Sequence, residues 1–188
     1  MRTAIVALVL AAAIAVLAGA GFIYSGIYNI AATEPHWGVT HWVLETVRDH
    51  SIKARAAGIQ VPPNLDEPAK LAIGVEHFAE HCAVCHGAPG VPKGDIAKGL
   101  YPQPPDLAGA AARYGDAELF WILKHGIKMT GMPGWPDHSD AELWATVAFL
   151  KKLPGMSVQD YAALVMAGMG HGEHHHPAGH ADKPDGKP

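Results

Sequence analysis

Cysteine is scarce in this chain, because only two of its 188 residues are Cys and they lie three positions apart. They leave no cysteine for a separate disulfide, and a structural zinc site would need a second cysteine pair. A strong excess of one charge is also lacking. The formal net charge is −4, which gives no support for a nucleic-acid partner. No segment alternates apolar and polar residues well enough to predict a strand, so we expect an all-α fold.

The two cysteines belong to the stretch Cys82-Ala83-Val84-Cys85-His86. A C-x-x-C-H pattern is typical of covalent attachment of one c-type haem. Two thiols at this spacing can bond both vinyl-derived arms of a porphyrin, and His86 can then bind the iron as proximal ligand. A thioredoxin-like motif would need a βαβ context, whereas the flanking residues predict helix. Haem attached in this way implies assembly outside the bacterial cytoplasm.

The N-terminal segment predicts a membrane anchor. Residues 4–24 carry no charge, and as a helix they would span about 31 Å, close to one hydrocarbon core. A cleaved signal peptide is the alternative, since residues 18–20 read Ala-Gly-Ala, like a small-residue cleavage site. The apolar run continues past that site, and Tyr24 and Tyr28 suit a membrane interface. A retained anchor over residues 1–30 is therefore favoured.

The rest of the sequence divides into three regions. Residues 31–65 predict a juxtamembrane helix, over about residues 35–57, and a linker stiffened by proline. Residues 66–155 predict a compact haem domain. Residues 156–188 predict a short helix followed by a disordered tail rich in Gly, Pro and His.

Four helices are predicted beyond the juxtamembrane one. An amphipathic helix begins at Pro68 and runs into the haem motif. Another runs from a capping box at residues 139–142 to about Leu153, and residues 116–125 predict a third between these two. A Ser-x-x-Asp start at Ser157 predicts the short fourth.

A haem iron that only carries electrons needs a second axial ligand besides the proximal His, and Met is the usual choice. The Gly-rich stretch 126–135 offers Met129 and Met132. Pro133 stiffens the chain directly after Met132, so we assign the iron to Met132 and a packing role to Met129. The alternative is that both methionines fill the core.

Several side chains leave alternatives open. Trp37 and Trp42 suit either a membrane interface or packing on the haem domain. His36, His41 and His50 are more simply explained as solvated or hydrogen-bonded residues than as a second metal site.

Five histidines gather within ten residues of the tail: His171, His174, His175, His176 and His180. Neutral imidazoles suit Cu(II), Ni(II) or Zn(II), which makes the tail a candidate metal-binding segment. A chain without fixed geometry binds such ions weakly. A role in copper handling and no role at all are both open.

Three groups of residues resemble those of the class I c-type cytochromes in order and spacing, over about residues 66–153. They are Gly74 and Phe78 before the haem motif, the loop Gly131-Met132-Pro133, and Thr146, Phe149 and Leu150.

The resemblance implies three to five helices around one covalent haem c, with the first and last helices crossing near Gly74 and Phe149. It implies that His86 and Met132 bind the iron and that one haem edge is exposed for electron transfer. The same family places a proline-rich turn at the haem crevice. Tyr101, Tyr114 and Trp135 are candidates for hydrogen bonding a propionate there, and ordinary aromatic core is the alternative for each.

The expected function is that of a membrane-anchored, mono-haem electron carrier, not an enzyme by itself. It would lie at a bacterial inner membrane with its haem domain in the periplasm. Its partners would be redox proteins in or at the membrane, with no nucleic acid and no small-molecule substrate. Three alternatives remain: a haem subunit stably bound in a dehydrogenase or oxidase complex, a copper-handling cytochrome that uses the His-rich tail, and a peroxidase or gas sensor, which needs Met132 to be weak or absent as a ligand.

Overall fold

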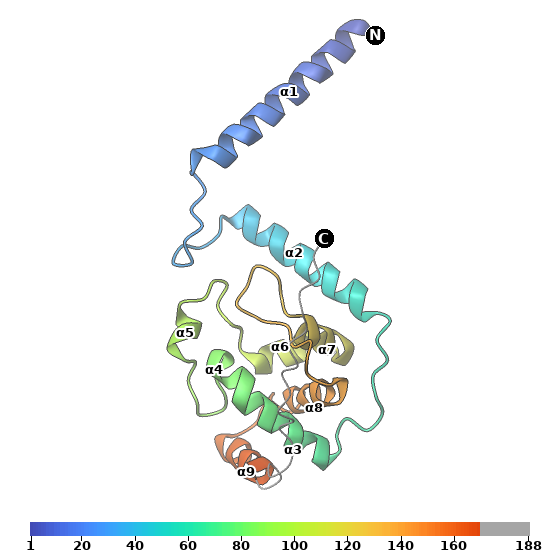
Figure 1. The fold of residues 1–188 in the computed structure, drawn as a ribbon, viewed down its shortest axis with the longest axis vertical. Coiled ribbons are helices and arrows are strands. Elements are labelled where there is room, and N and C mark those ends of the chain that lie inside the picture. The colour runs from blue at the N-terminus through green and yellow to red at the C-terminus, as the bar shows by residue number, and fades with distance from the viewer. Residues whose placement is uncertain (170–188) are drawn as a thin grey trace, which may run out of the picture.

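The computed structural model describes residues 1–169, and within that range it contains helices, turns and loops but no strand (Figure 1). The all-α architecture expected from the sequence is confirmed. The elements are α1 (Arg2–Ser25), α2 (Gly38–Ala56), α3 (Pro68–His77), the π-helix η1 (Phe78–Cys82), α4 (Ala83–His86), α5 (Asp95–Lys98), α6 (Leu107–Arg113), α7 (Asp116–His125), α8 (Asp140–Leu150) and α9 (Val158–Met169). The five histidines of the tail lie outside the described residues.

Helix α1 projects away from the other helices, and none of its residues is buried (Figure 1). Gly26 ends it with a left-handed backbone, φ +67°. Among the described residues, α1 is the one helix that is long and apolar enough to cross a membrane. Membrane anchors and signal sequences near an N-terminus both have this form.

The haem motif lies at the end of one continuous helical run made of α3, η1 and α4. Pro68 occupies the first turn, where its missing N–H leaves no hydrogen bond unmade. In η1 the backbone N–H of Ala83 donates to the Phe78 carbonyl, five residues back. Such π turns recur at functional sites, and this one shifts the helical register directly before Cys85 and His86.

Helices α3 and α8 cross in close contact at Gly74. A Cβ atom built on Gly74 would lie 2.0 Å from the Ala145 carbonyl oxygen and 3.0 Å from the Phe149 Cβ. One helical turn further along the chain, at the start of η1, the ring of Phe78 packs on that of Phe149 with centroids 4.9 Å apart. The crossing expected near Gly74 and Phe149 is confirmed.

Helix α8 forms the centre of the core, since residues 143–150 are all buried. Its predicted capping box is present: the Glu142 N–H donates to the Ser139 Oγ, and the Ser139 N–H donates to the Glu142 carboxylate. Helix α9 packs on α3, and its Tyr161 ring contacts Phe78 and Phe149.

Helix α2 packs against α7 and buries Ile52 and Ala56. It is shorter than the helix predicted over residues 35–57. Trp42 is 65% exposed, so it is not packed into the haem domain. Trp37 instead packs near the end of α1, with its ring centroid 5.9 Å from that of Phe22.

Residues 26–37, which connect α1 to α2, fold back on themselves and contact the haem domain. The Tyr28 ring lies 5.0 Å from the Trp37 ring, and its hydroxyl is 2.8 Å from the His36 Nδ1. The His36 N–H donates to the Tyr101 hydroxyl over 3.0 Å, and the two rings meet edge to face. A chain of aromatic contacts therefore links α1 to the loop that carries Tyr101.

We expect Gly74→Ala to lower the free energy of unfolding by about 3 kcal/mol, because the added methyl group would overlap backbone atoms of α8 that cannot move alone. Chemical denaturation of the haem-loaded protein would measure the loss. Gly58→Ala is the matched control, since no atom lies within 4 Å of a Cβ there. Equal stability of the two variants would contradict the close crossing.

Candidate functional site

A cavity of about 680 Å³ opens between the haem motif and four other segments of the chain. Its volume lies in the range of pockets that hold cofactors. The wall is largely apolar, and it includes Cys82, Cys85 and His86 at one end of the α3–η1–α4 run. Most of the remaining wall comes from α2, the proline-rich turn with α6, helix α7 and the loop that carries Met132, and Leu150 of α8 adds to it.

His86 has a fixed tautomer because its Nδ1 lies 2.9 Å from the Pro105 carbonyl oxygen. A carbonyl can only accept, so Nδ1 must carry the proton and Nε2 keeps its lone pair. Burial lowers the pKa of His86, an effect that Lys93 reinforces and the hydrogen bond to Pro105 opposes. The imidazole is therefore neutral near pH 7 and able to bind a metal through Nε2.

The two thiols differ in burial. Cys82 is 6% exposed, and burial together with the nearby Cys85 raises its pKa to about 12. Cys85 is less buried, and both cysteines are free. Their position on the cavity wall beside His86 suits two thioether bonds to one porphyrin, so the residues present fit a covalent haem.

The loop that carries Met132 is closed by its own hydrogen bonds. The Met132 N–H donates to the Thr130 hydroxyl, the Thr130 hydroxyl donates to the Ile127 carbonyl, and the Ile127 N–H donates to the Met132 carbonyl. At Gly126, φ is +64° and a Cβ would lie 2.5 Å from the Gly134 nitrogen, so only glycine fits. The loop holds Met132 against the cavity.

Met129 does not pack in the core. Its side chain is 72% exposed and its backbone is left-handed, with φ +60°. The packing role predicted for Met129 is therefore wrong. The turn that closes the loop at Thr130 directs Met132 inward and leaves Met129 in solvent.

The three aromatic candidates for the haem crevice occupy different places. Trp135 and Tyr114 line the cavity, whereas Tyr101 is not among the residues that line it. The Tyr101 hydroxyl accepts a hydrogen bond from the His36 backbone. Pro102 and Pro104, from the same proline-rich turn, do line the cavity.

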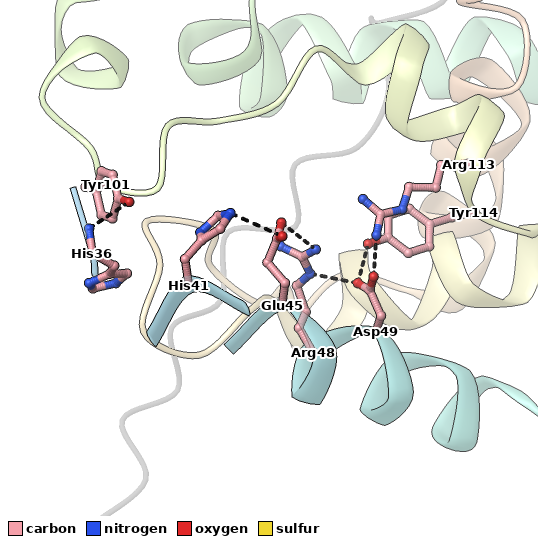
Figure 2. Close-up of polar contacts among 8 residues, drawn as sticks. All are labelled: His36, His41, Glu45, Arg48, Asp49, Tyr101, Arg113 and Tyr114. Carbon is pink, nitrogen blue, oxygen red and sulfur yellow. Dashed lines mark hydrogen bonds and ion pairs between the residues drawn. The ribbon is translucent and has the colours of Figure 1, made fainter. Parts of the chain in front are cut away.

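Sequence reasoning missed the wall that α2 provides. Glu45, Arg48 and Ile52 of this helix line the cavity. Figure 2 shows how α2 is held there: Asp49 binds the guanidinium of Arg113 and accepts a hydrogen bond of 3.1 Å from the Tyr114 hydroxyl. These partners lie 64 and 65 residues away in the chain, so no local sequence pattern predicts the contact.

The three isolated histidines near α2 are not gathered at one site. His36 contacts Tyr28 and Tyr101, and His41 pairs with Glu45 over 3.2 Å (Figure 2). His50 is exposed. Within residues 1–169, one group of three side chains is placed so that it could hold a metal ion, and other histidines form it: His77, His81 and His138. Sequence reasoning passed over these three, although His77 and His81 have the i, i+4 spacing of a paired ligand on a helix.

Residues 69–150 match the family model described as cytochrome C oxidase, cbb3-type, subunit III. The matched segment contains the C-x-x-C-H motif, Gly74 and Met132. It begins in α3 and ends with α8, so α1, α2 and α9 lie outside it.

We expect Asp49→Ala to loosen α2 from the haem domain, because it removes the acceptor for Arg113 and Tyr114. Hydrogen exchange of the α2 amides should accelerate, while His50→Ala, at the next position, should leave the exchange unchanged.

Burial acts to raise the pKa of Asp49, but Arg48, Tyr114 and Arg113 outweigh it and hold this pKa below its ordinary value. The contact should therefore persist at neutral pH and weaken only as the pH falls through that lowered pKa. Unchanged exchange in Asp49→Ala would contradict the role of this contact.

Proposed function

Because residues 69–150 form a class I c-type cytochrome domain, which binds covalent haem c and serves electron transfer, we propose that this chain is a membrane-tethered carrier of single electrons. In this proposal Cys82 and Cys85 attach the haem, and His86 and Met132 bind its iron. The observation that carries it is the cavity whose wall includes all four side chains, with His86 already in the tautomer that a metal requires.

Haem c, when bound, supplies a reversible one-electron Fe(II)/Fe(III) couple. The protein's part is to hold the ligands and exclude water. Pro105 orients His86 through its carbonyl, and the hydrogen-bonded loop holds Met132 at the cavity. A Met thioether opposite His raises the potential. If His86 and Met132 both held the iron, no ligand position would stay open for oxygen chemistry, which favours electron transfer over a peroxidase or gas sensor.

The surroundings of the cavity also support this assignment. Most of its lining is apolar, including Leu119, Ile122 and Leu123. An apolar, poorly hydrated environment is one of the means by which a protein sets the reduction potential of a haem. The cavity wall includes two guanidinium groups, those of Arg48 and Arg113. They suit the negative propionates of a haem.

Substituting Met132 tests the distal ligand. In oxidised protein, Met132→Ala should abolish the weak sulfur-to-iron charge-transfer band in the far red and lower the midpoint potential, because the thioether ligand is lost. Met129→Ala is the matched control: it lies three residues away in the same loop with an exposed side chain, so it should spare both. Retention of the band in Met132→Ala, or its absence from the unaltered protein, would refute the assignment.

The tether in this proposal is α1. Covalent haem attachment takes place outside the bacterial cytoplasm, so the haem domain would lie in the periplasm and α1 in the inner membrane. Tethering keeps the carrier at a high local concentration near membrane complexes. The length and apolar composition of α1, none of whose residues is buried, support this placement.

The full-length haem-loaded chain should sediment with membranes, resist a high-salt wash and enter solution only with detergent. Salt screens charges but does not weaken apolar burial. Mass spectrometry of the extracted protein should find residues 2–25 retained. A chain in which a cleavable secretion signal replaces α1 is the control, and it should be soluble. Recovery of a mature protein without α1 would show that the segment is a signal.

A second candidate function is a haem subunit held stably in an oxidase or dehydrogenase complex. The description of the matching family, subunit III of a cbb3-type oxidase, favours it. The same detergent extract separates the two candidates. A free carrier elutes as the single chain in its micelle, whereas a subunit elutes with a larger partner in fixed ratio.

A further inference from the structure

Three histidines that the haem assignment does not use meet beside the cavity. They are His77 on α3, His81 on η1 and His138 in the loop before α8. One ring nitrogen from each lies within 4.8 Å of one from each of the others. We propose that these three imidazoles bind one divalent transition-metal ion, with Cu(II) preferred over Zn(II).

The arrangement is close to what such an ion requires. The His77 Nε2 and the His138 Nδ1 are 2.9 Å apart, and ring centroids are 4.7 Å apart for His77 with each of the other two. Imidazole ligands lie about 2.0–2.1 Å from such ions, so two of them in a tetrahedral site are about 3.3 Å apart. Ring movements of about an ångström convert the observed cluster into three ligands, and water fills the fourth position.

The donor chemistry selects the class of ion. Neutral imidazole nitrogen suits Cu(II) and Zn(II), whereas Mg²⁺ and Ca²⁺ prefer oxygen ligands. For a given nitrogen site, affinity rises along the first-row divalent ions to a maximum at Cu(II). The site contains no cysteine, so it lacks the soft thiolate that favours Cu(I).

The His77 ring is buried, and within residues 1–169 one of its nitrogens is left without a hydrogen-bond partner. His77 is 7% exposed, and among the described residues its Nδ1 is a buried polar atom without a hydrogen-bond partner. Burial lowers the pKa of His77 to about 4, helped by His81 and His138 and opposed by Glu142. The His77 ring therefore does not need to lose a proton near pH 7 before it can accept a metal.

Negative charge nearby suits a cation. The Glu142 carboxylate accepts from the Ser139 backbone and hydroxyl, and Ser139 chiefly lowers its pKa, with contributions from His138 and His77. The Glu80 Oε2 lies 3.7 Å from the His81 Nε2. The lowered pKa keeps Glu142 ionised at neutral pH, and its negative charge reduces the cost of placing a divalent ion here.

Access and rigidity also favour binding. His81 and His138 are only partly buried, so an ion can reach the cluster from solvent. Two of the ligands lie on the helices α3 and η1, which hold a site more precisely than loops do, and His138 lies in the loop directly before the capped start of α8.

The cluster is coupled to the haem cavity through Trp135. The Trp135 ring contacts all three imidazoles, with centroid distances of 5.8 Å to His77, 4.8 Å to His81 and 5.0 Å to His138. Trp135 and His81 both line the cavity as well. A divalent ion at the cluster therefore adds positive charge beside the cavity, which favours the reduced iron and raises the midpoint potential.

The test uses the full-length, haem-loaded chain, with the tail altered so that its histidines do not compete. The background variant carries Asn in place of five residues: His171, His174, His175, His176 and His180. CuCl₂ and ZnCl₂ are titrated separately in competition with a chromogenic chelator. We expect one tight equivalent of either ion, with Cu(II) tighter, and a rise in the haem midpoint potential on Zn(II) loading.

In the same background, His138→Ala should weaken binding at least about tenfold and abolish the rise in potential. His50→Ala, an exposed histidine outside the cluster, is the matched control and should change neither. His138 lies in a loop at a partly exposed position, so an unchanged haem spectrum confirms that the variant is folded. The absence of a tight equivalent in the background protein, or equal weakening by His50→Ala, overturns the proposal.

Discussion

At Gly74 the backbones of α3 and α8 come so close that no side chain fits between them. Helix α8 is buried around its whole circumference over residues 143–150, so its position is set by contacts on every side. Helix α3 continues through η1 into the haem motif, and Leu150 of α8 forms part of the cavity wall. The close contact at Gly74 thus fixes the position of the helical run that carries Cys82, Cys85 and His86, and so places these side chains at the cavity.

The cavity itself is assembled from segments that are distant in the chain. Pro105 fixes the tautomer of His86 from 19 residues away, and α2 closes one wall through Asp49, which contacts residues 64 and 65 positions later. Loop closure over such distances costs conformational entropy. Burial of Ile52 and of the core around Phe78 and Phe149 offsets that cost.

Local patterns predicted the local features. The C-x-x-C-H motif and the capping box at Ser139 follow from short-range chemistry that one sequence reveals. The helix crossing at Gly74 is expected only from the resemblance to class I c-type cytochromes. The π turn escaped prediction because its five-residue hydrogen bond leaves no compositional mark. The docking of α2 and the meeting of His77 with His138, 61 residues apart, depend on the tertiary fold, which periodicity does not encode. Met129 and Met132 could be ranked by their neighbours, but only the turn at Thr130 decides which of them faces the cavity.

The folded connection between α1 and α2 bears on which proteins the proposed carrier can reach. Fully extended, residues 26–37 would allow the haem domain to stand about 40 Å from the end of α1. The contacts of Tyr28, His36 and Trp37 with one another and with Tyr101 shorten this tether and restrict its rotation. In a membrane, such a domain would stay at one height and in one orientation above the lipid. The domain could then exchange electrons only with proteins whose own cofactors lie at a matching distance from the bilayer, whatever the charges on their surfaces.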